Sequence, residues 1–435
     1  MKLCIIGTGY VGLVSGTCFA DLGNKVYCVD NDINKIKKLN SGVSPIYEPG
    51  LDEIIKINRT SGRLIFTNDL KTAVLNSDII FICVGTPNIK GTQSVNLSYV
   101  FKSIKEIAKV TSGKKIIVTK STVPVSTGDQ IENILKKMKR NKFEVLSNPE
   151  FLREGEAIRD FRYPDRIVVG ANNKKTFDII KRLYQPLINK GAKFFVTSRR
   201  GAELIKYASN AFLATKITFI NELSNLCEKA NINIEDISLG MGSDLRIGSR
   251  FLRAGPAYGG SCFPKDTKGL VSTGIKYKTD LSIVKAVIQS NNKRKILHTK
   301  KIVNILKNKI KNKKIAFLGV TFKPNTDDMR DSTSLTMIPY LLKKGAIVSY
   351  YDPTGVKKDF QKLKNCHYHN DIKLACKNAD LIILHTEWDE FKSLDFKKLS
   401  NKNDCSLYDL RNLYDYEEML KKKIIYYSIG RPPIK

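Results

Sequence analysis

The chain has 435 residues, of which 42% are hydrophobic and 27% charged, a balance that excludes disordered and fibrous proteins and predicts two or three globular domains. The net charge is +32, but the lysines are spread along the chain without an arginine-rich tail or zinc-finger spacing, so we expect no nucleic-acid partner. No segment approaches the roughly 20 apolar residues that span a bilayer, so we expect no membrane partner either.

The first block, residues 1–198, alternates strand-like apolar runs with helical or loop segments. The runs cover residues 2–6, 25–29, 79–84, 115–118 and 143–146. The first run stops at Gly7, and we interpret it as a buried strand rather than a secretion signal. The alternation predicts a parallel, doubly wound sheet with helices on both faces.

The second block, residues 199–296, has a helical pattern. Between residues 203 and 229, no Pro or Gly interrupts the apolar spacing, which is formed by Leu204, Ala208, Ala211, Phe212, Thr215 and Phe219. A helix of this length between two α/β lobes is typical of a spine or a subunit interface. We therefore expect a central helical domain and a homodimer.

The third block, residues 297–435, resembles the first in outline. Residues 314–319 match 2–7, residues 348–352 match 26–30, and residues 379–384 match 77–82. The fold class we predict is α/β, with two Rossmann-like doubly wound lobes joined by a central helical domain. The third block lacks the full glycine fingerprint, so we expect only one dinucleotide site.

A glycine turn formed by Gly7, Gly9 and Gly12 follows the first strand and opens an apolar helix. Asp30 ends the next strand about twenty residues on, which is the context of a dinucleotide site. The amides of the helix N-terminus would bind the pyrophosphate. Asp30 would accept hydrogen bonds from the ribose hydroxyls and repel a 2'-phosphate, which favours NAD over NADP.

Two threonines follow later strands at the same sheet edge. Thr86 and Thr122 are therefore candidate cofactor contacts, although each segment also fits a simple turn.

Cys262 stands in the most informative segment. It follows the flexible pair Gly259 and Gly260 and precedes Lys265 and Asp266. Nearby positive charge favours a thiolate, which can add to an aldehyde and, after loss of a hydride, leave a thioester. Water would release the product with the help of a base, for which Asp266 and a glutamate elsewhere are candidates. The alternative is a buried cysteine without a chemical role.

Two further pairs of polar residues are candidates. Lys206 and Asn210 are four apart on the predicted helix and could hold a developing oxyanion, unless they belong to a solvated face. Glu150 and Glu154 follow a strand of the first block and could orient water or substrate, or cap the next helix.

The remaining cysteines and histidines suggest neither disulfides nor a metal. The nine cysteines are an odd number without CxxC pairs, which predicts a reducing, cytoplasmic location. His367 and His369 lack carboxylate or cysteine partners at ligand spacing, so we expect surface residues and no bound metal.

Six motifs in order resemble the UDP-glucose 6-dehydrogenase family, within the wider UDP-glucose/GDP-mannose dehydrogenase group. They are GTGYVGL (7–13), STVP (121–124), NPEFLREG (148–155), AELIKYASNAFLATK (202–216), GGSCFPKD (259–266) and GVTFKPNTDDMR (319–330). Together they cover nearly the whole chain.

The resemblance implies an NAD-dependent, four-electron oxidation of UDP-glucose to UDP-glucuronate. It also implies an NAD domain (1–198), a dimerisation domain (199–296) and a UDP-sugar domain (297–435). Cys262 matches the family nucleophile, Lys206 and Asn210 the residues that polarise the C6 oxygen, and Asp266 the carboxylate of the cysteine loop. Thr122 and Glu150 match residues that position water.

The resemblance implies two larger sets of contacts. Those with the cofactor are Gly7, Gly9, Tyr10, Val11, Gly12, Asp30, Lys35, Thr86, Thr122, Glu154, Lys265 and Arg330. Those with the substrate are Glu150, Phe151, Leu152, Arg153, Glu154, Lys206, Asn210, Arg246, Phe251, Leu252, Arg253, Ala254, Gly255, Gly259 and Lys323. Whether Arg246 reaches the substrate of a neighbouring subunit stays open.

Three alternatives differ in chemistry. A sister enzyme would act on GDP-mannose or another nucleotide sugar, although Phe263 after the cysteine favours UDP-glucose. A two-electron hydroxyacid-type dehydrogenase would need no thiolate. A polyanion-binding protein with a Rossmann lobe would show strongly salt-dependent binding.

Overall fold

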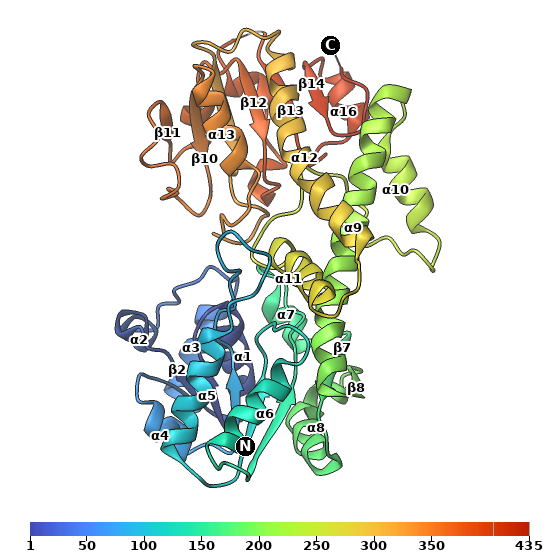
Figure 1. Ribbon diagram of the computed structural model, residues 1–435. Helices are drawn as coiled ribbons and strands as arrows, with labels where there is room; N and C mark the ends of the chain where they lie inside the picture. The colour runs from blue at the N-terminus through green and yellow to red at the C-terminus, as the bar shows by residue number, and fades with distance from the viewer. Residues whose placement is uncertain (403, 435) are drawn as a thin grey trace. The chain divides into compact units, whose positions relative to one another are not determined.

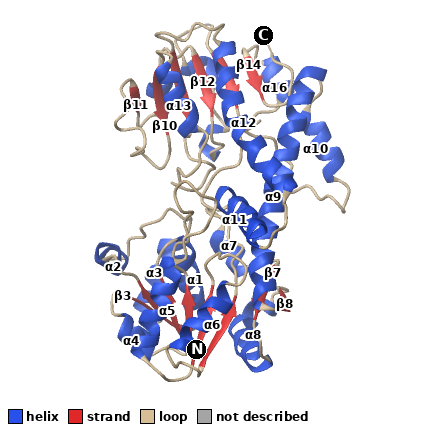
Figure 2. Cartoon of the chain, viewed as in Figure 1, coloured by secondary structure: helices blue, strands red, loops and turns tan. Residues whose placement is uncertain are grey.

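The structure is a computed structural model that describes residues 1–402 and 404–434 (Figure 1). The chain divides into two compact units, Met1–Ser209 with Lys268–Asp280, and Asn210–Thr267 with Leu281–Lys435. Each unit contains one sheet with helices around it (Figure 2). The three-domain boundaries expected from the sequence stay a prediction.

The first sheet has eight strands in the order β3-β2-β1-β4-β5-β6-β7-β8. They are β1 (Lys2–Ile6), β2 (Lys25–Val29), β3 (Leu64–Thr67), β4 (Ile79–Ile82), β5 (Lys115–Thr119), β6 (Phe143–Ser147), β7 (Arg166–Gly170) and β8 (Lys193–Thr197). The first six are parallel, whereas β7 is antiparallel to β6 and parallel to β8. The strands predicted from the sequence, β1, β2 and β4 to β6, are parallel as expected. The antiparallel step is at β7, which the sequence analysis did not identify and whose direction depends on the path of the chain between strands.

Helices cover both faces of this sheet. One face packs against α1 (Tyr10–Asp21), α2 (Ile33–Asn40), α3 (Leu51–Thr60), α7 (Ala157–Arg162) and α8 (Lys174–Ile188). The other packs against α4 (Leu70–Leu75), α5 (Ser98–Val110) and α6 (Thr127–Lys137). Each face buries its own apolar core, which is the doubly wound arrangement predicted for the first block.

The second sheet has six parallel strands in the order β11-β10-β9-β12-β13-β14. They are β9 (Lys314–Leu318), β10 (Ile347–Tyr351), β11 (Cys366–Tyr368), β12 (Leu381–Leu384), β13 (Ser406–Asp409) and β14 (Tyr426–Ser428). One face packs against α12 (Ser282–Ile305) and α13 (Ser334–Lys343). The other packs against α14 (Ile372–Cys376), η1 (Asp389–Phe391), α15 (Phe396–Leu399) and α16 (Tyr416–Lys421).

The similarity between the first and third blocks is confirmed in strand order and in side chains. Strands β9 to β14 repeat the order of β1 to β6. Asp30 follows β2 and pairs with Lys35 at 2.9 Å, and Asp352 follows β10 and pairs with Lys357 at 3.2 Å. The second pair is almost fully buried, and Asp352 also accepts the amide of Val320 at 2.8 Å.

The remaining helices are α9 (Arg199–Ala230), α10 (Ile234–Gly242) and α11 (Phe263–Lys276). The helix α9 has 32 residues and confirms the uninterrupted helix predicted over residues 203–229. The predicted fold class is therefore confirmed, with two Rossmann-like lobes and a central helical region.

The cysteines of the first sheet pack in its core. Cys4, Cys28 and Cys83 are buried, as expected from their apolar neighbours. No disulfide joins any cysteines among residues 1–402 and 404–434. Within the same residues, no helix combines the length and the apolar character that crossing a membrane requires.

Candidate active site

The glycine turn of the first unit is shaped to receive a phosphate group. Gly7 has φ of +95°, and a Cβ on Gly12 would lie 1.9 Å from the Gly7 carbonyl oxygen, so both positions require glycine. Gly9 is the N-cap of α1, and a Cβ built on it meets nothing within 4 Å. The first amides of α1 are therefore accessible to an anion, as a dinucleotide pyrophosphate requires.

Asp30 is held at the end of β2 by hydrogen bonds from Thr8 and Lys35. Its Oδ2 accepts the amide and the hydroxyl of Thr8 at 2.9 and 2.7 Å, and Lys35 donates to the same oxygen. Burial raises the pKa of Asp30, but hydrogen bonds from Asp32, Lys35 and Thr8 outweigh it and lower the pKa to about 2. The side chain is thus an anion at neutral pH, which suits hydroxyls and disfavours a phosphate.

The loops after β4 and β5 are joined to each other. The Thr86 hydroxyl donates to the Thr122 carbonyl at 2.9 Å. The Ser121 hydroxyl donates to the Val84 carbonyl at 2.7 Å. The two candidate threonines therefore lie together at the same sheet edge, as the strand order predicts.

Glu150 and Lys206 form a buried ion pair in the first unit. Lys206 Nζ lies 3.0 Å from Glu150 Oε1, and the two side chains are 4% and 5% exposed. The other Glu150 oxygen accepts the Leu152 amide at 2.6 Å, and the Lys206 ammonium lies 5.3 Å from the Phe151 ring centroid. A solvated face is therefore wrong for Lys206, and Glu150 does not cap α7.

Glu48 is a buried carboxylate that the sequence analysis missed. It accepts hydrogen bonds from the Gly155 and Ala157 amides at 2.6 and 2.7 Å, and from the Tyr10 hydroxyl. It thereby caps α7 and joins the segment that carries Glu154 to the start of α1. Burial and the Glu48 carboxylate raise the pKa of Tyr10 well above its usual range. No local pattern marks Glu48, because its partners lie 38 residues before it and 107 to 109 residues after it.

Arg153 is fixed at the surface end of the same segment. Its guanidinium pairs with Asp160 at 2.6 Å and with Glu156 at 2.6 Å. These contacts hold Arg153, a candidate substrate residue, against the N-terminal end of α7.

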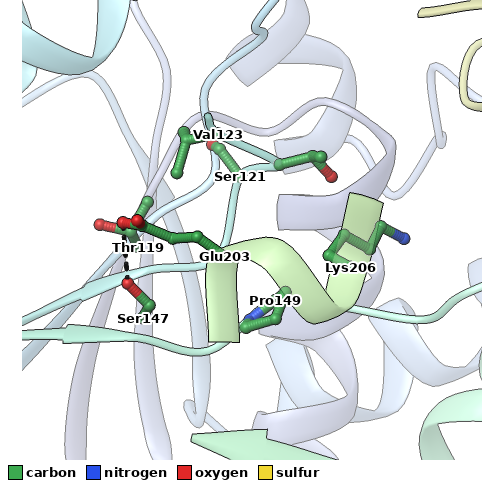
Figure 3. A pocket seen from close by; sticks show the side chains of 8 residues that line it. Thr119, Ser121, Val123, Ser147, Pro149, Glu203 and Lys206 are labelled. Carbon is green, nitrogen blue, oxygen red and sulfur yellow. Dashed lines mark hydrogen bonds between the residues drawn. The ribbon is translucent and has the colours of Figure 1, made fainter. Parts of the chain in front are cut away.

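A small pocket lies beside α9 in the first unit (Figure 3). Its volume is about 10 Å³. One water molecule needs about 10–15 Å³, so the pocket is of about one-water size. It is lined by Thr119, Ser121, Thr122, Val123, Ser147, Pro149, Glu203 and Lys206. Two predicted catalytic residues, Thr122 and Lys206, therefore border one cavity.

In the second unit, Cys262 precedes the first turn of α11. The Asp266 amide donates to the Cys262 carbonyl at 2.8 Å, which places the cysteine at the N-cap, and a helix N-terminus favours the thiolate form of a cysteine. The Cys262 sulfur lies 3.4 Å from the Ser261 hydroxyl.

The glycine pair before the cysteine is packed rather than flexible. A Cβ on Gly259 would lie 2.6 Å from the Asp331 carbonyl oxygen, and one on Gly260 would lie 2.7 Å from the Phe322 ring. The Gly260 amide also donates to the Arg330 carbonyl at 2.7 Å. The expectation of flexibility is therefore wrong, because close packing against residues 322–331 leaves no room for a side chain.

Asp266 is almost fully buried beside the cysteine. It accepts a hydrogen bond from Asn210 Nδ2 at 2.6 Å and pairs with Lys265 at 2.5 Å. The positive charge of Lys265 is therefore partly neutralised by the Asp266 carboxylate. Asn210 is also buried, so the alternative of a solvated face is wrong for it as well.

The predicted substrate segment 251–255 and the neighbouring Tyr258 are held by polar residues that the sequence analysis missed. Asn221 accepts the Gly255 amide at 2.8 Å, and Arg294 donates to the Gly255 carbonyl at 2.7 Å. Asn291 binds both the amide and the carbonyl of Tyr258. Polar residues recurring along α12 were the available signal, but only the tertiary structure shows what they bind.

The remaining candidates lie in local ion pairs or ring contacts. Arg246 is 89% exposed and pairs with Asp244 at 2.6 Å. Arg330 pairs with Asp328 at 2.7 Å. Phe251 has φ of +66°, and Arg253 donates to the Asn412 carbonyl at 3.2 Å. Other members of the set are found in the same segments: Lys323 lies over Phe322, and Leu252 and Ala254 are buried.

Metal-ligating side chains do not gather in groups of three anywhere in residues 1–402 and 404–434.

Comparison with known families identifies all three parts of the chain. Residues 1–188 match the NAD binding domain of the UDP-glucose/GDP-mannose dehydrogenase family, residues 200–293 its central domain, and residues 316–416 its UDP binding domain. The chain belongs to the UDP-glucose/GDP-mannose dehydrogenase family. It is therefore an NAD-dependent oxidoreductase with a UDP-binding domain, and the glycine turn described above fits that cofactor.

Individual relatives of this dehydrogenase span its whole length. The chain is 48% identical to a UDP-glucose 6-dehydrogenase of Rhizobium meliloti (strain 1021), covering 99% of this chain and 100% of the relative. It is 43% identical to the UDP-glucose 6-dehydrogenase TuaD of Bacillus subtilis (strain 168), covering 100% of this chain and 94% of the relative. Among solved structures, a UDP-glucose dehydrogenase from Pyrobaculum islandicum is similar with a TM-score of 0.90 and 33% identity, covering 99% and 97%.

Proposed function

We propose that this dehydrogenase oxidises the C6 hydroxymethyl group of UDP-glucose to the carboxylate of UDP-glucuronate. The observation that carries the proposal is end-to-end similarity, at 43–48% identity, to relatives named UDP-glucose 6-dehydrogenase. Solved dehydrogenases named for N-acetylated or GDP-linked sugars are 24–29% identical to the chain. The closeness to the first group favours UDP-glucose as the substrate.

In the proposed reaction, Cys262 is the nucleophile. After the first oxidation, its sulfur adds to the C6 aldehyde carbon and forms a thiohemiacetal, and loss of a hydride from that carbon leaves a thioester. Water attacks the thioester carbonyl, releases the carboxylate and restores the thiol. NAD held by the glycine turn and Asp30 would supply the hydride acceptor for both oxidations, so two NAD would be consumed for each sugar.

The residues of one turn of α9 would stabilise charge on the C6 oxygen. Lys206 offers an ammonium and Asn210 an amide, and both act more strongly when buried because water does not screen them. Thr122 and Glu150 would position the attacking water, and the one-water size of the pocket beside Thr122 supports this role. Asp266, which is hydrogen-bonded to Asn210, would accept the proton that the attacking water loses.

The residues predicted to contact the two nucleotides carry the charges and hydrogen-bond donors that suit the groups they would bind. The amides of α1 would bind the NAD pyrophosphate, and Asp30 with Lys35 would bind the ribose. On the substrate side, Lys323 and Arg246 carry the positive charge that a diphosphate requires.

We propose that the enzyme works as a homodimer in the cytoplasm. Three large apolar side chains of α9 recur at intervals of seven residues, which places them on one face. They are exposed by 66% for Phe212, 48% for Phe219 and 61% for Leu226. An apolar face of this kind is typical of a subunit interface. The cytoplasmic location is supported by the cysteine content.

The decisive experiment counts NADH formed per UDP-glucose consumed, with limiting sugar and excess NAD. We expect two NADH per sugar. One NADH per sugar would contradict the thioester route and indicate a two-electron dehydrogenase. No NADH with UDP-glucose but two with GDP-mannose would move the enzyme to the sister activity.

A further inference from the structure

Glu203 is a buried carboxylate of α9 that the proposed reaction does not use. Glu203 is 3% exposed to solvent. It precedes Lys206 by three residues, so the two side chains leave neighbouring positions of one helix. Figure 3 shows the Glu203 carboxylate directed toward Thr119 and Ser147, whereas Lys206 is directed the other way.

The Glu203 carboxylate caps α6, although the two lie far apart in sequence. Its Oε2 accepts the Ser126 amide at 2.7 Å, and its Oε1 accepts the Gly128 amide at 2.7 Å and the Ser147 hydroxyl at 3.3 Å. The first amides of a helix need acceptors, which the N-cap side chain usually supplies. Among the described residues, the Ser126 side chain makes no such bond, and its φ is +76°. The cap therefore comes from a residue 75 positions later.

The segment that Glu203 caps is the one that carries Thr122. Residues 120–126 connect β5 to α6, and Ser121 and Thr86 fasten the first half of this segment to the loop after β4. Glu203 fastens the second half at Ser126. The Thr122 segment is therefore held at both ends, and at the second end Glu203 binds the Ser126 amide while Lys276 donates to the Ser126 hydroxyl at 2.9 Å.

A second contact between the same helices keeps Glu203 in place. One turn earlier on α9, Arg199 pairs with Asp129 of α6 at 2.8 Å. The Arg199 side chain is 7% exposed, so solvent screens this pair little. The start of α9 and the start of α6 thus form one connected unit.

The position is costly for a residue with only a structural role. Burial raises the pKa of Glu203 to about 7, outweighing the hydrogen bonds from Gly128, Ser126 and Ser147, and the charge of Asp129 raises it further. A capping acceptor on an exposed side chain would hold α6 without burying a charge. Costly buried carboxylates of this kind gather at functional sites.

We propose that Glu203 is a positioning residue, which sets the place of Thr122 and, through Thr122, the step in which water releases the product from Cys262. The inference rests on the proposed function. It makes Glu203 the support of the hydrolysis step rather than of the two oxidation steps.

Rapid mixing of Glu203→Gln with UDP-glucose and NAD tests the proposal. The amide keeps one acceptor and turns its NH2 group toward a backbone N–H, so the α6 cap is half lost. We expect a first turnover that forms NADH as fast as the wild type, then a steady-state rate about 10- to 100-fold lower, the cost of about 1 Å of misplacement. Mass spectrometry of the quenched protein should show the acyl adduct on Cys262. Glu203→Asp, which keeps the charge but shortens its reach, should give the same pattern if Glu203→Gln does not fold.

Two comparisons separate positioning from general damage. Asn173→Ala is the matched control, because it removes the cap of α8, where Asn173 accepts the Thr176 amide at 2.9 Å. It should leave both rates unchanged, since α8 follows the antiparallel strand β7 and begins at the opposite sheet edge. Thr122→Ala combined with Glu203→Gln should be no slower than Thr122→Ala alone.

Equal loss of the first-turnover and steady-state rates in Glu203→Gln would overturn the proposal, as would wild-type values for both. If the wild type itself forms no NADH from UDP-glucose, the proposed function fails instead. Two NADH per sugar in the wild type, with unaltered kinetics in the variant, would remove the role of Glu203 alone.

Discussion

Lys206 Nζ lies 3.0 Å from Glu150 Oε1, and neither side chain is more than 5% exposed. The pair joins α9 to the segment that follows β6. Removal of one partner would leave the other as an uncompensated buried charge, which is among the most destabilising changes a protein can undergo. The same ammonium is the group we expect to stabilise the C6 oxygen.

The first prediction concerns that pair. Lys206→Met should lower the free energy of unfolding by about 3 kcal/mol and the turnover number by about 10²- to 10³-fold. Adding Glu150→Gln should restore part of the stability, because it removes the unpaired buried charge. It should not restore turnover, because the ammonium that would contact the oxyanion is still missing. Denaturant unfolding and NADH formation measure the two effects. Additive losses of stability in the double variant would show that the two charges do not interact.

The second prediction concerns the nucleophile. Cys262→Ala should reduce UDP-glucose oxidation by at least about 10³-fold and leave NAD binding intact, since Cys262 and the glycine turn are separate groups. Cys405→Ala is the matched control, because that cysteine is also partly buried but follows no glycine turn and precedes no predicted catalytic residue. Steady-state NADH formation and titration with NAD are the two measurements. Persistent turnover in the alanine variant would leave the thioester route without its nucleophile.

The third prediction concerns cofactor choice. Asp30→Asn should lower the preference for NAD over NADP by about tenfold or more, since a like-charge contact at protein dielectric costs more than 1 kcal/mol. The ratio of kcat/KM for the two cofactors measures the change. Asp52→Asn, a substitution of another carboxylate in the same unit, serves as the control and should leave the ratio alone. An unchanged ratio in Asp30→Asn would mean that another group excludes the 2'-phosphate.

The fourth prediction concerns pH and the same carboxylate. The pKa of Asp30 is lowered from 3.8 to about 2 in the folded protein. Below pH 4 the unfolded chain therefore binds more protons than the folded one, and the stability contributed by Asp30 falls as pH falls toward 2. Its size is about 1 kcal/mol after solvent screening. Unfolding of Asp30→Asn should show a shallower loss of stability between pH 4 and pH 2 than the wild type, and parallel curves would contradict the lowered pKa.

The fifth prediction concerns the apolar face of α9. Phe219→Glu should place a charge in the proposed subunit interface and reduce the mass in solution to that of one chain, 49.0 kDa. Leu374→Glu is the matched control, because Leu374 is 51% exposed on α14 and lies outside that face. Light scattering distinguishes the two. A wild-type mass of 49.0 kDa would contradict the dimer itself.

Much of the fold was predictable from short-range patterns. The buried strands β1, β2 and β4 to β6 are visible in the sequence as apolar segments. The apolar residues of α9 recur with a period of about 3.6 residues, which indicates a helix. The φ of +95° at Gly7 shows why the glycine turn is legible in the sequence, since only glycine adopts that conformation without strain. The repeat of the two lobes follows from the same kind of local match.

The candidate site was only partly predictable. Its motif residues, such as Cys262 and Lys206, stand in recognisable segments, and the structure pairs Lys206 with Glu150 and Asn210 with Asp266. The residues that support them carry no local signature. Glu203 in a helical run reads as an ordinary polar position, and nothing near it in sequence announces that it caps α6.

By itself, the sequence determined β1, β2, β4 to β6, the long helix α9, the dinucleotide turn and the motifs of the family, because period, φ and motif spacing are properties of neighbouring residues. Only the tertiary structure decided the reversed direction of β7, the close packing of Gly260 and the partners of Glu48 and Glu203. These depend on contacts between segments far apart in the chain. A buried polar group must find its partner wherever the path of the backbone brings one, and that path is a property of the whole fold.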